Sequence, residues 1–102
     1  MIDAMLLSRE MILARLREAK ATLQHEFPLQ RLALFGSYAS GKQIDSKSDV
    51  DILVEVDPSI GLGFVTLAER IENILGARVD LVSRRAIKPS LWARIEPDLI
   101  DA

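Results

Sequence analysis

The chain has 102 residues, which is enough for one compact domain and too few for two. Hydrophobic residues make up 49% and charged residues 27%, a balance typical of a globular protein and unlike that of a disordered chain. The formal net charge is -2, whereas a dedicated nucleic-acid-binding domain is usually basic. We therefore expect no direct contact with nucleic acid.

The residue types that are missing exclude several kinds of chemistry. Without cysteine there can be no disulfide, thiolate zinc site or cysteine nucleophile. The single histidine, His25, is too little for a His-rich metal site or a Ser-His-Asp triad. No stretch approaches the roughly 18 apolar residues of a membrane helix, and the charges near the N-terminus do not suit a signal peptide. We expect a single cytoplasmic domain over residues 1–102 without membrane contact.

The first half of the chain predicts one helix and two strands. Apolar residues at helical spacing predict an amphipathic helix from Ser8, a plausible N-cap, to about Glu26, ended by Pro28. The apolar run Arg31–Phe35 predicts a buried strand, and the polar segment 37–47 predicts a loop with one helical turn at its start. Residues Val50–Val56 form the clearest strand.

The alternation in this last strand separates two faces. One face is aliphatic and carries Val50, Ile52, Val54 and Val56, whereas the other carries Asp49, Asp51, Leu53 and Glu55. The aliphatic face is expected to pack into the core, so that the acidic side chains point the other way.

The second half of the chain predicts a helix, a strand and a short last helix. An amphipathic helix is expected at Phe64–Leu75, followed by a strand at Arg78–Val82 and a basic turn at Arg84–Lys88. The residues expected to face inward from the longer helix are Val65, Ala68, Ile71, Ile74 and Leu75. Pro89 can open the last helix, which carries Leu91, Trp92 and Ile95 as core or partner contacts. This order predicts an α/β (α+β) fold with a small mixed sheet of three or four strands covered by helices.

The paired aspartates Asp49 and Asp51 are the first chemical signal. Two residues apart on a strand, they leave the same face about 6.7 Å apart. Two ionised carboxylates at that distance repel by roughly 2–3 kcal/mol at an effective dielectric near 20, which raises the pKa of one of them. A divalent cation relieves this conflict, and Mg²⁺ prefers oxygen ligands of this kind.

Gly36 and Ser37 follow directly after the first predicted strand. Glycine allows the backbone to come close to a ligand, and a helical turn begun by Ser37 offers amides and a hydroxyl to phosphate oxygens. A third carboxylate, Asp80, is expected on the same sheet face as the aspartate pair if their strands are neighbours. It could bind a second metal ion or accept the proton of an attacking hydroxyl.

The combination of Gly36-Ser37, Asp49-Val50-Asp51 and a later strand with Asp80 resembles the minimal nucleotidyltransferases of the DNA polymerase β-like superfamily. The wording LFGSYASG…SDVDILVEV is similar to that of small antitoxins encoded beside HEPN-domain toxins, and the resemblance extends from about residue 10 to 96. It implies that Asp49, Asp51 and Asp80 are the catalytic, magnesium-binding carboxylates and that Gly36 and Ser37 bind the ATP triphosphate.

The same resemblance implies that AMP is transferred from ATP to a tyrosine of a partner HEPN ribonuclease, which silences this toxin in a hetero-oligomer. Two positions depart from the family pattern. The spacer between Ser37 and Asp49 has one residue more than the ten that are usual, and Ser40 stands where the family often has arginine. Lys42 or Lys47 could replace that arginine.

Each motif also has a purely structural interpretation. A lone Asp-x-Asp strand is more often a solvated edge than a metal site, and an acidic residue such as Asp80 is common on exposed strands. The basic turn at residues 84–88 is usually solvated; its alternative role is to attract an acidic partner or ATP phosphates. Two alternatives to the antitoxin enzyme are a non-catalytic antitoxin of the same fold and an enzyme that modifies a small molecule. A chain of this length has no second domain for a small-molecule pocket, which counts against the latter.

Overall fold

The computed structural model describes residues 7–41 and 49–102. Its helices are α1 (Arg9–Glu26), α2 (Ser37–Ser40), α3 (Gly63–Leu75) and α4 (Pro89–Ile95). Its strands are β1 (Leu29–Phe35), β2 (Val50–Val56), β3 (Val79–Ser83) and β4 (Ile100–Asp101). Short turns of 3-10 helix, η1 (Pro58–Ile60), η2 (Arg84–Ala86) and η3 (Glu96–Asp98), join these elements.

The strands form one mixed four-stranded sheet in the order β3-β2-β1-β4. Strand β1 runs antiparallel to both β2 and β4, whereas β2 and β3 are parallel and are connected through α3. The predicted α+β fold with a small mixed sheet is therefore confirmed, and the strand that the chain-order prediction lacked is β4.

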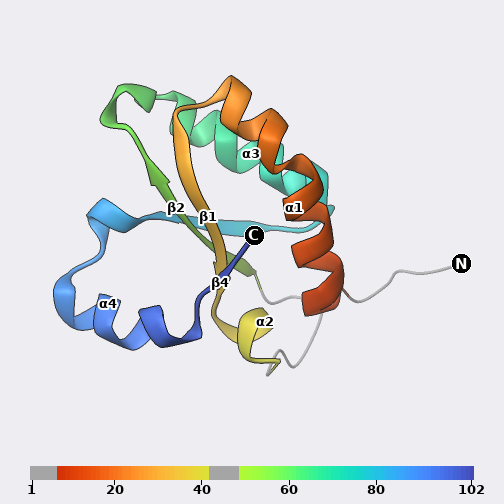
Figure 1. The fold of residues 1–102 in the computed structure, drawn as a ribbon, viewed down its shortest axis with the longest axis vertical. Helices are drawn as coiled ribbons and strands as arrows, with labels where there is room; N and C mark the ends of the chain where they lie inside the picture. The colour runs from red at the N-terminus through yellow and green to blue at the C-terminus, as the bar shows by residue number, and fades with distance from the viewer. Residues whose placement is uncertain (1–6, 42–48) are drawn as a thin grey trace, which may run out of the picture.

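Helices cover the sheet on both sides. The strands separate α1 and α3 from α4, as Figure 1 shows. Most of the core lies on the side of α1 and α3, where Leu16 and Ile71 pack with Leu34 and Ile52. A smaller cluster on the other side joins α4 to the sheet; it consists of Ala33, Leu53 and Ile87 with Phe35, Val82, Trp92, Ile95 and Leu99 around them. The alternation of the strands thus supplies two apolar faces of different size.

Helix α1 begins and ends where the sequence predicts. The Ser8 hydroxyl accepts a hydrogen bond of 3.1 Å from the amide of Met11, and the helix ends at Glu26, two residues before Pro28. His25 lies in the last turn, as expected for a basic residue at the negative end of the helix dipole.

The inward face of α3 differs from the prediction at two positions. Val65 was expected to face inward, but its side chain is 58% exposed. Leu67, absent from the predicted set, is fully buried with Ile71 and Leu75. These buried residues are four positions apart and form one stripe of the helix. Ala68 and Ile74 lie at the margin of that stripe and are partly buried.

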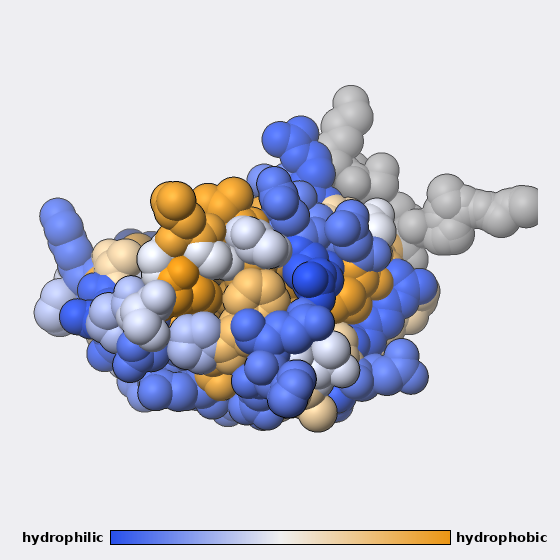
Figure 2. Space-filling model, turned by 90° about the horizontal axis from the view of Figure 1, so that it is seen from above, coloured by the Kyte–Doolittle hydropathy of each residue, from blue (hydrophilic) through white to orange (hydrophobic). Residues whose placement is uncertain are grey.

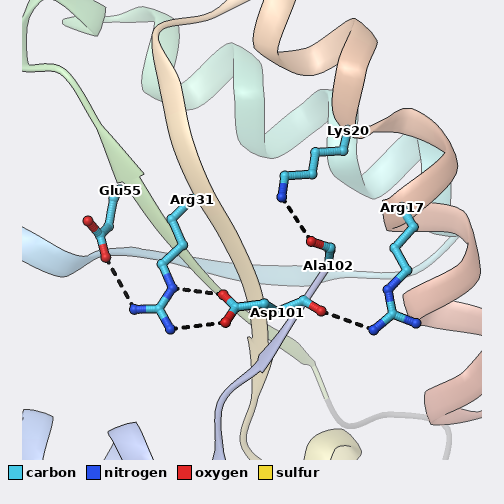
Figure 3. Close-up of polar contacts among 6 residues, drawn as sticks. All are labelled: Arg17, Lys20, Arg31, Glu55, Asp101 and Ala102. Carbon is cyan, nitrogen blue, oxygen red and sulfur yellow. Dashed lines mark hydrogen bonds and ion pairs between the residues drawn. The ribbon is translucent and has the colours of Figure 1, made fainter.

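Strand β4 is held by charged side chains that come from distant parts of the chain (Figure 3). The Arg31 guanidinium donates to both carboxylate oxygens of Asp101, at 2.8 and 3.3 Å, and to Glu55 at 3.3 Å. Arg17 donates to the Asp101 carbonyl at 3.1 Å, and Lys20 donates to the Ala102 carbonyl at 2.9 Å. The hydrogen bond from Arg31 lowers the pKa of the Asp101 carboxyl below its ordinary value.

The surface is mostly hydrophilic. The face shown in Figure 2 also has a patch of hydrophobic side chains among polar ones. The large hydrophobic side chains exposed by the described residues are Met11, Leu62, Val65 and Leu91. In the same part of the chain, no helix has both the length and the apolar character needed to cross a bilayer.

Candidate active site

Asp51 and Asp80 lie side by side on neighbouring strands. They are register partners in the parallel pair of β2 and β3, whose backbones are about 4.8 Å apart. The residues next to Asp80 along the chain, Val79 and Leu81, pack against the main core on the opposite face. The prediction that Asp80 shares a sheet face with Asp51 is therefore confirmed.

The surroundings of Asp51 make its charge costly. This side chain is half-buried. On the central strand β2, Asp51 has Asp80 of β3 as one register partner and Phe35 of β1 as the other. The pKa of Asp51 is raised to about 6, first by burial and then by the charges of Asp80 and Asp49. The sequence predicted a raised pKa from repulsion within the Asp49–Asp51 pair, but burial is the larger cause and Asp80 is the stronger charged neighbour.

Gly36 brings the bend after β1 against Asp51. Its backbone has φ 79° and ψ -155°, a conformation that is essentially confined to glycine. A Cβ atom on Gly36 would lie 2.9 Å from Cγ of Asp51 and 3.0 Å from its Cβ, which is too close for real atoms. The bend and the carboxylate are thus direct neighbours, with no room for a side chain between them.

The predicted helical turn after this bend is α2. The Gly36 carbonyl accepts hydrogen bonds from the amides of Ala39 and Ser40, both at 3.1 Å. The Ser40 hydroxyl donates to the Ser37 carbonyl at 3.2 Å. The Arg9 guanidinium, from the first turn of α1, donates to the Ala39 carbonyl at 3.0 Å and so attaches α2 to α1. No sequence signal pointed to Arg9, because this contact joins residues that are 30 positions apart.

Asp49 lies just before β2 and is exposed. Its carboxylate is 3.9 Å from Nε of Arg78, a loose ion pair between two well-solvated side chains. Within residues 7–41 and 49–102, no three His, Cys, Asp or Glu side chains are already arranged to hold a metal ion. Lys42 and Lys47, proposed above as substitutes for the family arginine, lie outside the described residues.

Helix α4 borders the aspartates on the same sheet face. Trp92 packs against the cluster around Leu53 and Val82, and each of these two residues lies two positions after an aspartate of the pair. Two residues of a strand span about 7 Å. The Arg84 guanidinium lies over the Trp92 ring, 3.9 Å from its centroid, in a cation–π contact that the sequence did not predict.

The donor set suits a hard divalent cation. Asp49, Asp51 and Asp80 offer carboxylate oxygens only, the kind of ligand that Mg²⁺ prefers. Burial is the main cause of the raised pKa of Asp51, and the charges of Asp80 and Asp49 raise it further; a cation would compensate this part of the effect. Ligation by all three residues requires a movement of at least one side chain, since they do not form a ready-made cluster.

Comparison with curated proteins points to enzymes that act on proteins. A candidate protein adenylyltransferase of Methanocaldococcus jannaschii is 42% identical over 90 residues, which cover 83% of this chain and 88% of that protein. Protein adenylyltransferase MntA of Thermococcus cleftensis is 39% identical over 88 residues, with coverages of 84% and 87%.

Solved structures with the same fold include antitoxins. A candidate minimal nucleotidyltransferase superimposes with a TM-score of 0.77 at 34% identity, covering 92% of this chain and 95% of that one. A toxin–antitoxin complex solved with AMP-PNP gives 0.64 at 29% identity, covering 93% and 72%. The complex of an MNT antitoxin with the tri-AMPylated HEPN toxin of Shewanella oneidensis gives 0.64 at 26% identity, covering 89% and 71%.

The family assignment rests on a match that spans most of the chain. Residues 16–101 fit the model of the nucleotidyltransferase domain, so that the match includes all four strands and helices α2, α3 and α4. The matched residues include Asp49, Asp51, Asp80 and the bend at Gly36. This chain therefore belongs to the nucleotidyltransferase domain family.

Proposed function

We propose that this chain is the antitoxin of a HEPN-domain ribonuclease and silences that toxin by transferring AMP from ATP to one of its tyrosines, with Mg²⁺ as cofactor. The observation that carries the proposal is the register pair Asp51–Asp80 placed directly beside the bend at Gly36. The similarity of this chain to protein adenylyltransferases and to antitoxins solved with HEPN toxins supports the same function.

The three carboxylates and the bend at Gly36 have different roles in this proposal. Asp49, Asp51 and Asp80 would hold the magnesium, and Gly36 and Ser37 would bind the triphosphate through backbone amides and the serine hydroxyl. When bound, Mg²⁺ supplies positive charge that neutralises the phosphate oxygens. Because Gly36 touches Asp51, nucleotide and carboxylates are held within a single small region.

The chemical step is an in-line displacement at the α-phosphorus of ATP. The acceptor tyrosine oxygen forms a bond to that phosphorus, the bond to the bridging oxygen breaks, and pyrophosphate leaves with the bonding electrons. Asp80 is the exposed member of the register pair and therefore the one that an incoming hydroxyl can reach. It either accepts the proton of the hydroxyl or completes the metal site.

A labelling experiment tests this proposal. The protein is incubated with ATP labelled on the α-phosphate, Mg²⁺ and the HEPN protein encoded beside it, and label on the toxin is measured. We expect transfer by the natural chain and a loss of at least about 100-fold in the Asp51→Asn and Asp80→Asn variants. Asp98→Asn, an exposed aspartate beyond α4, is the matched control and should label normally.

A non-catalytic antitoxin of the same fold is the second candidate, and Ser40 is the observation that favours it. The Ser40 hydroxyl bonds to the Ser37 carbonyl, so this position contributes no cation to a nucleotide. A stable complex with the toxin, full neutralisation and no label would favour binding alone. In either case we propose a hetero-oligomer with the toxin in the cytoplasm.

A further inference from the structure

The lysine and arginine side chains that the structure describes, within residues 7–41 and 49–102, fall into two groups. One group is used inside the fold, where each member contacts an oxygen of the chain: Arg9, Arg15, Arg17, Lys20, Arg31, Arg70 and Arg78. The other group makes no hydrogen bond or ion pair with any described residue: Arg84, Arg85, Lys88 and Arg94. All four come from one short stretch, residues 84–94, which includes η2, the N-cap Lys88 and α4.

Two of these four cations flank an exposed leucine on α4. Lys88 and Arg94 are exposed, and Leu91, midway between them in the sequence, is 47% exposed although it is a large apolar side chain. Arg85 lies instead close enough to Asp57, after the end of β2, to interact with its charge. Lys88, Leu91 and Arg94 are three positions apart, which places them along one side of the helix. The inward side of the same helix is taken by Trp92. We call Lys88, Leu91 and Arg94 the α4 surface.

Helix α4 lies on the same sheet face as the candidate active site. Its Trp92 and Ile95 belong to the cluster that also contains Leu53 and Val82, which are two residues along their strands from Asp51 and Asp80. The aspartates and α4 therefore share one face of the sheet, whereas α1 and α3 cover the other (Figure 1). A protein that presents a side chain to Asp80 approaches the sheet face on which α4 lies.

We propose that the α4 surface docks an acidic segment of the acceptor protein, with Leu91 packing against an apolar side chain within that segment. This inference rests on the proposed function, because the occupant is the protein that receives AMP. Charge complementarity carries it: within residues 7–41 and 49–102 of this acidic chain, the cations without a hydrogen bond or ion pair lie together in residues 84–94, next to the sheet face that carries the aspartates. Charges at the rim of an interface mainly raise the association rate, and Leu91 supplies the apolar contact.

An acidic protein segment fits this surface better than a nucleic acid does. Binding of single-stranded nucleic acid usually combines cations with open aromatic rings on which bases stack. The one aromatic side chain of α4, Trp92, packs against the sheet and is covered by Arg84. The surface therefore offers charge and a leucine without a stacking platform.

A pair of double variants tests the proposal. Lys88→Gln with Arg94→Gln removes two positive charges from the α4 surface. Gln24→Glu with Thr66→Glu changes the net charge equally at exposed positions of α1 and α3, on the other side of the sheet. For each protein, kcat/KM for the HEPN toxin, KM for ATP and the affinity of the toxin complex are measured at low and at physiological ionic strength.

We expect the α4 double variant to lose about fivefold to tenfold in kcat/KM for the toxin at low ionic strength, with a weaker dependence on salt. Its KM for ATP should stay unchanged, and the α1/α3 control should retain the natural kcat/KM. Lys88→Arg should behave as the natural chain, whereas Leu91→Ser should speed dissociation of the complex.

Three results would overturn the inference. Equal losses in both double variants would assign the effect to net charge, and a raised KM for ATP would assign these cations to the nucleotide. Tighter binding of a single-stranded RNA probe to the natural chain than to the α4 variant, with unchanged toxin kinetics, would assign them to nucleic acid. If the natural chain transfers no AMP, the proposed function fails, while the toxin affinity of the two double variants still decides whether the α4 surface docks the toxin.

Discussion

Gly36 touches the carboxylate of Asp51 so closely that even a methyl group between them would overlap, since its carbon would lie 2.9 Å from Cγ. We therefore expect Gly36→Ala to push the aspartate away and to reduce AMP transfer by about 100-fold or more, because small misplacements at a reaction centre are costly. Kinetics of AMP transfer would measure this loss.

Gly41→Ala is the matched control for that change. Gly41 has a similarly positive φ of 75°, but an added Cβ would meet nothing within 4 Å. It should cost about 1–2 kcal/mol of unfolding free energy through backbone strain and leave transfer largely intact. Equal inactivation of both variants would mean that strain in α2, and not crowding of Asp51, controls activity.

Asp51 should make the metal-free protein less stable as the pH rises. Its pKa is about 6 in the folded chain and about 3.8 when unfolded, so the folded state holds the proton more tightly. The free energy of unfolding should thus fall between about pH 4 and 6 and change no further above that range on account of this group.

Asp51→Asn should therefore stabilise the protein at pH 7.5 in EDTA by about 1–2 kcal/mol, a figure reduced for the solvent exposure of the side chain, and should change little at pH 4. Urea unfolding at the two pH values would measure this. A stabilisation that is equal at both would show that the carboxylate charge is not its cause.

Arg9 should act on ATP through the position of α2. Removal of its 3.0 Å hydrogen bond to the Ala39 carbonyl frees the end of α2, the helix that follows the bend at Gly36. Arg9→Ala is expected to raise KM for ATP by about fivefold with little change in kcat, and Arg9→Lys should restore part of the loss.

The control for Arg9 is Arg17→Ala. Arg17 lies on the same helix and also bonds to a main-chain carbonyl, that of Asp101, at 3.1 Å. A similar loss of stability in both variants, with a raised KM for ATP in Arg9→Ala alone, would establish that Arg9 positions α2. An equal KM for ATP in the two variants would contradict this role.

The buried stripe of α3 predicts a contrast between two neighbouring substitutions. Leu67→Ala removes a fully buried side chain and should cost about 2–5 kcal/mol of unfolding free energy. Val65→Ala truncates a side chain that is 58% exposed and should stay within about 0.5 kcal/mol. Thermal or urea unfolding would measure both, and the reverse ranking would contradict the orientation of this helix.

Local sequence patterns were sufficient to predict most helices and strands, because the signals of each element lie within a short stretch of sequence. Alternation in β2 separated its acidic face from its core face, and Pro28 marked the end of α1. The inward face of α3 was misassigned although its periodicity contains the answer. At about 100° per residue, Val65 lies about 120° from Ile71 around the helix axis, whereas Leu67 lies only about 40° from it, so that Leu67 and not Val65 belongs to the buried stripe.

Long-range contacts explain what the sequence did not reveal. Strand β4 has only two residues, too few for a recognisable pattern. It pairs with β1, and Arg17, Lys20 and Arg31 contact it from elsewhere in the chain. The facing of Asp51 and Asp80 followed from alternation, but their register did not, since it depends on how α3 returns the chain to the sheet. Burial of Asp51 likewise depends on Gly36 and on its neighbours in the sheet.

The acidic pair Asp51–Asp80 exists only when the parallel strands β2 and β3 pair in the correct register. A slip of β3 by one residue would turn Asp80 toward α1 and α3 and set an aliphatic side chain next to Asp51. Such a chain would retain its helices and most of its buried surface, yet its acidic pair would be gone. A molecule with the wrong register of β3 would therefore be folded but inactive, and activity would report correct strand pairing.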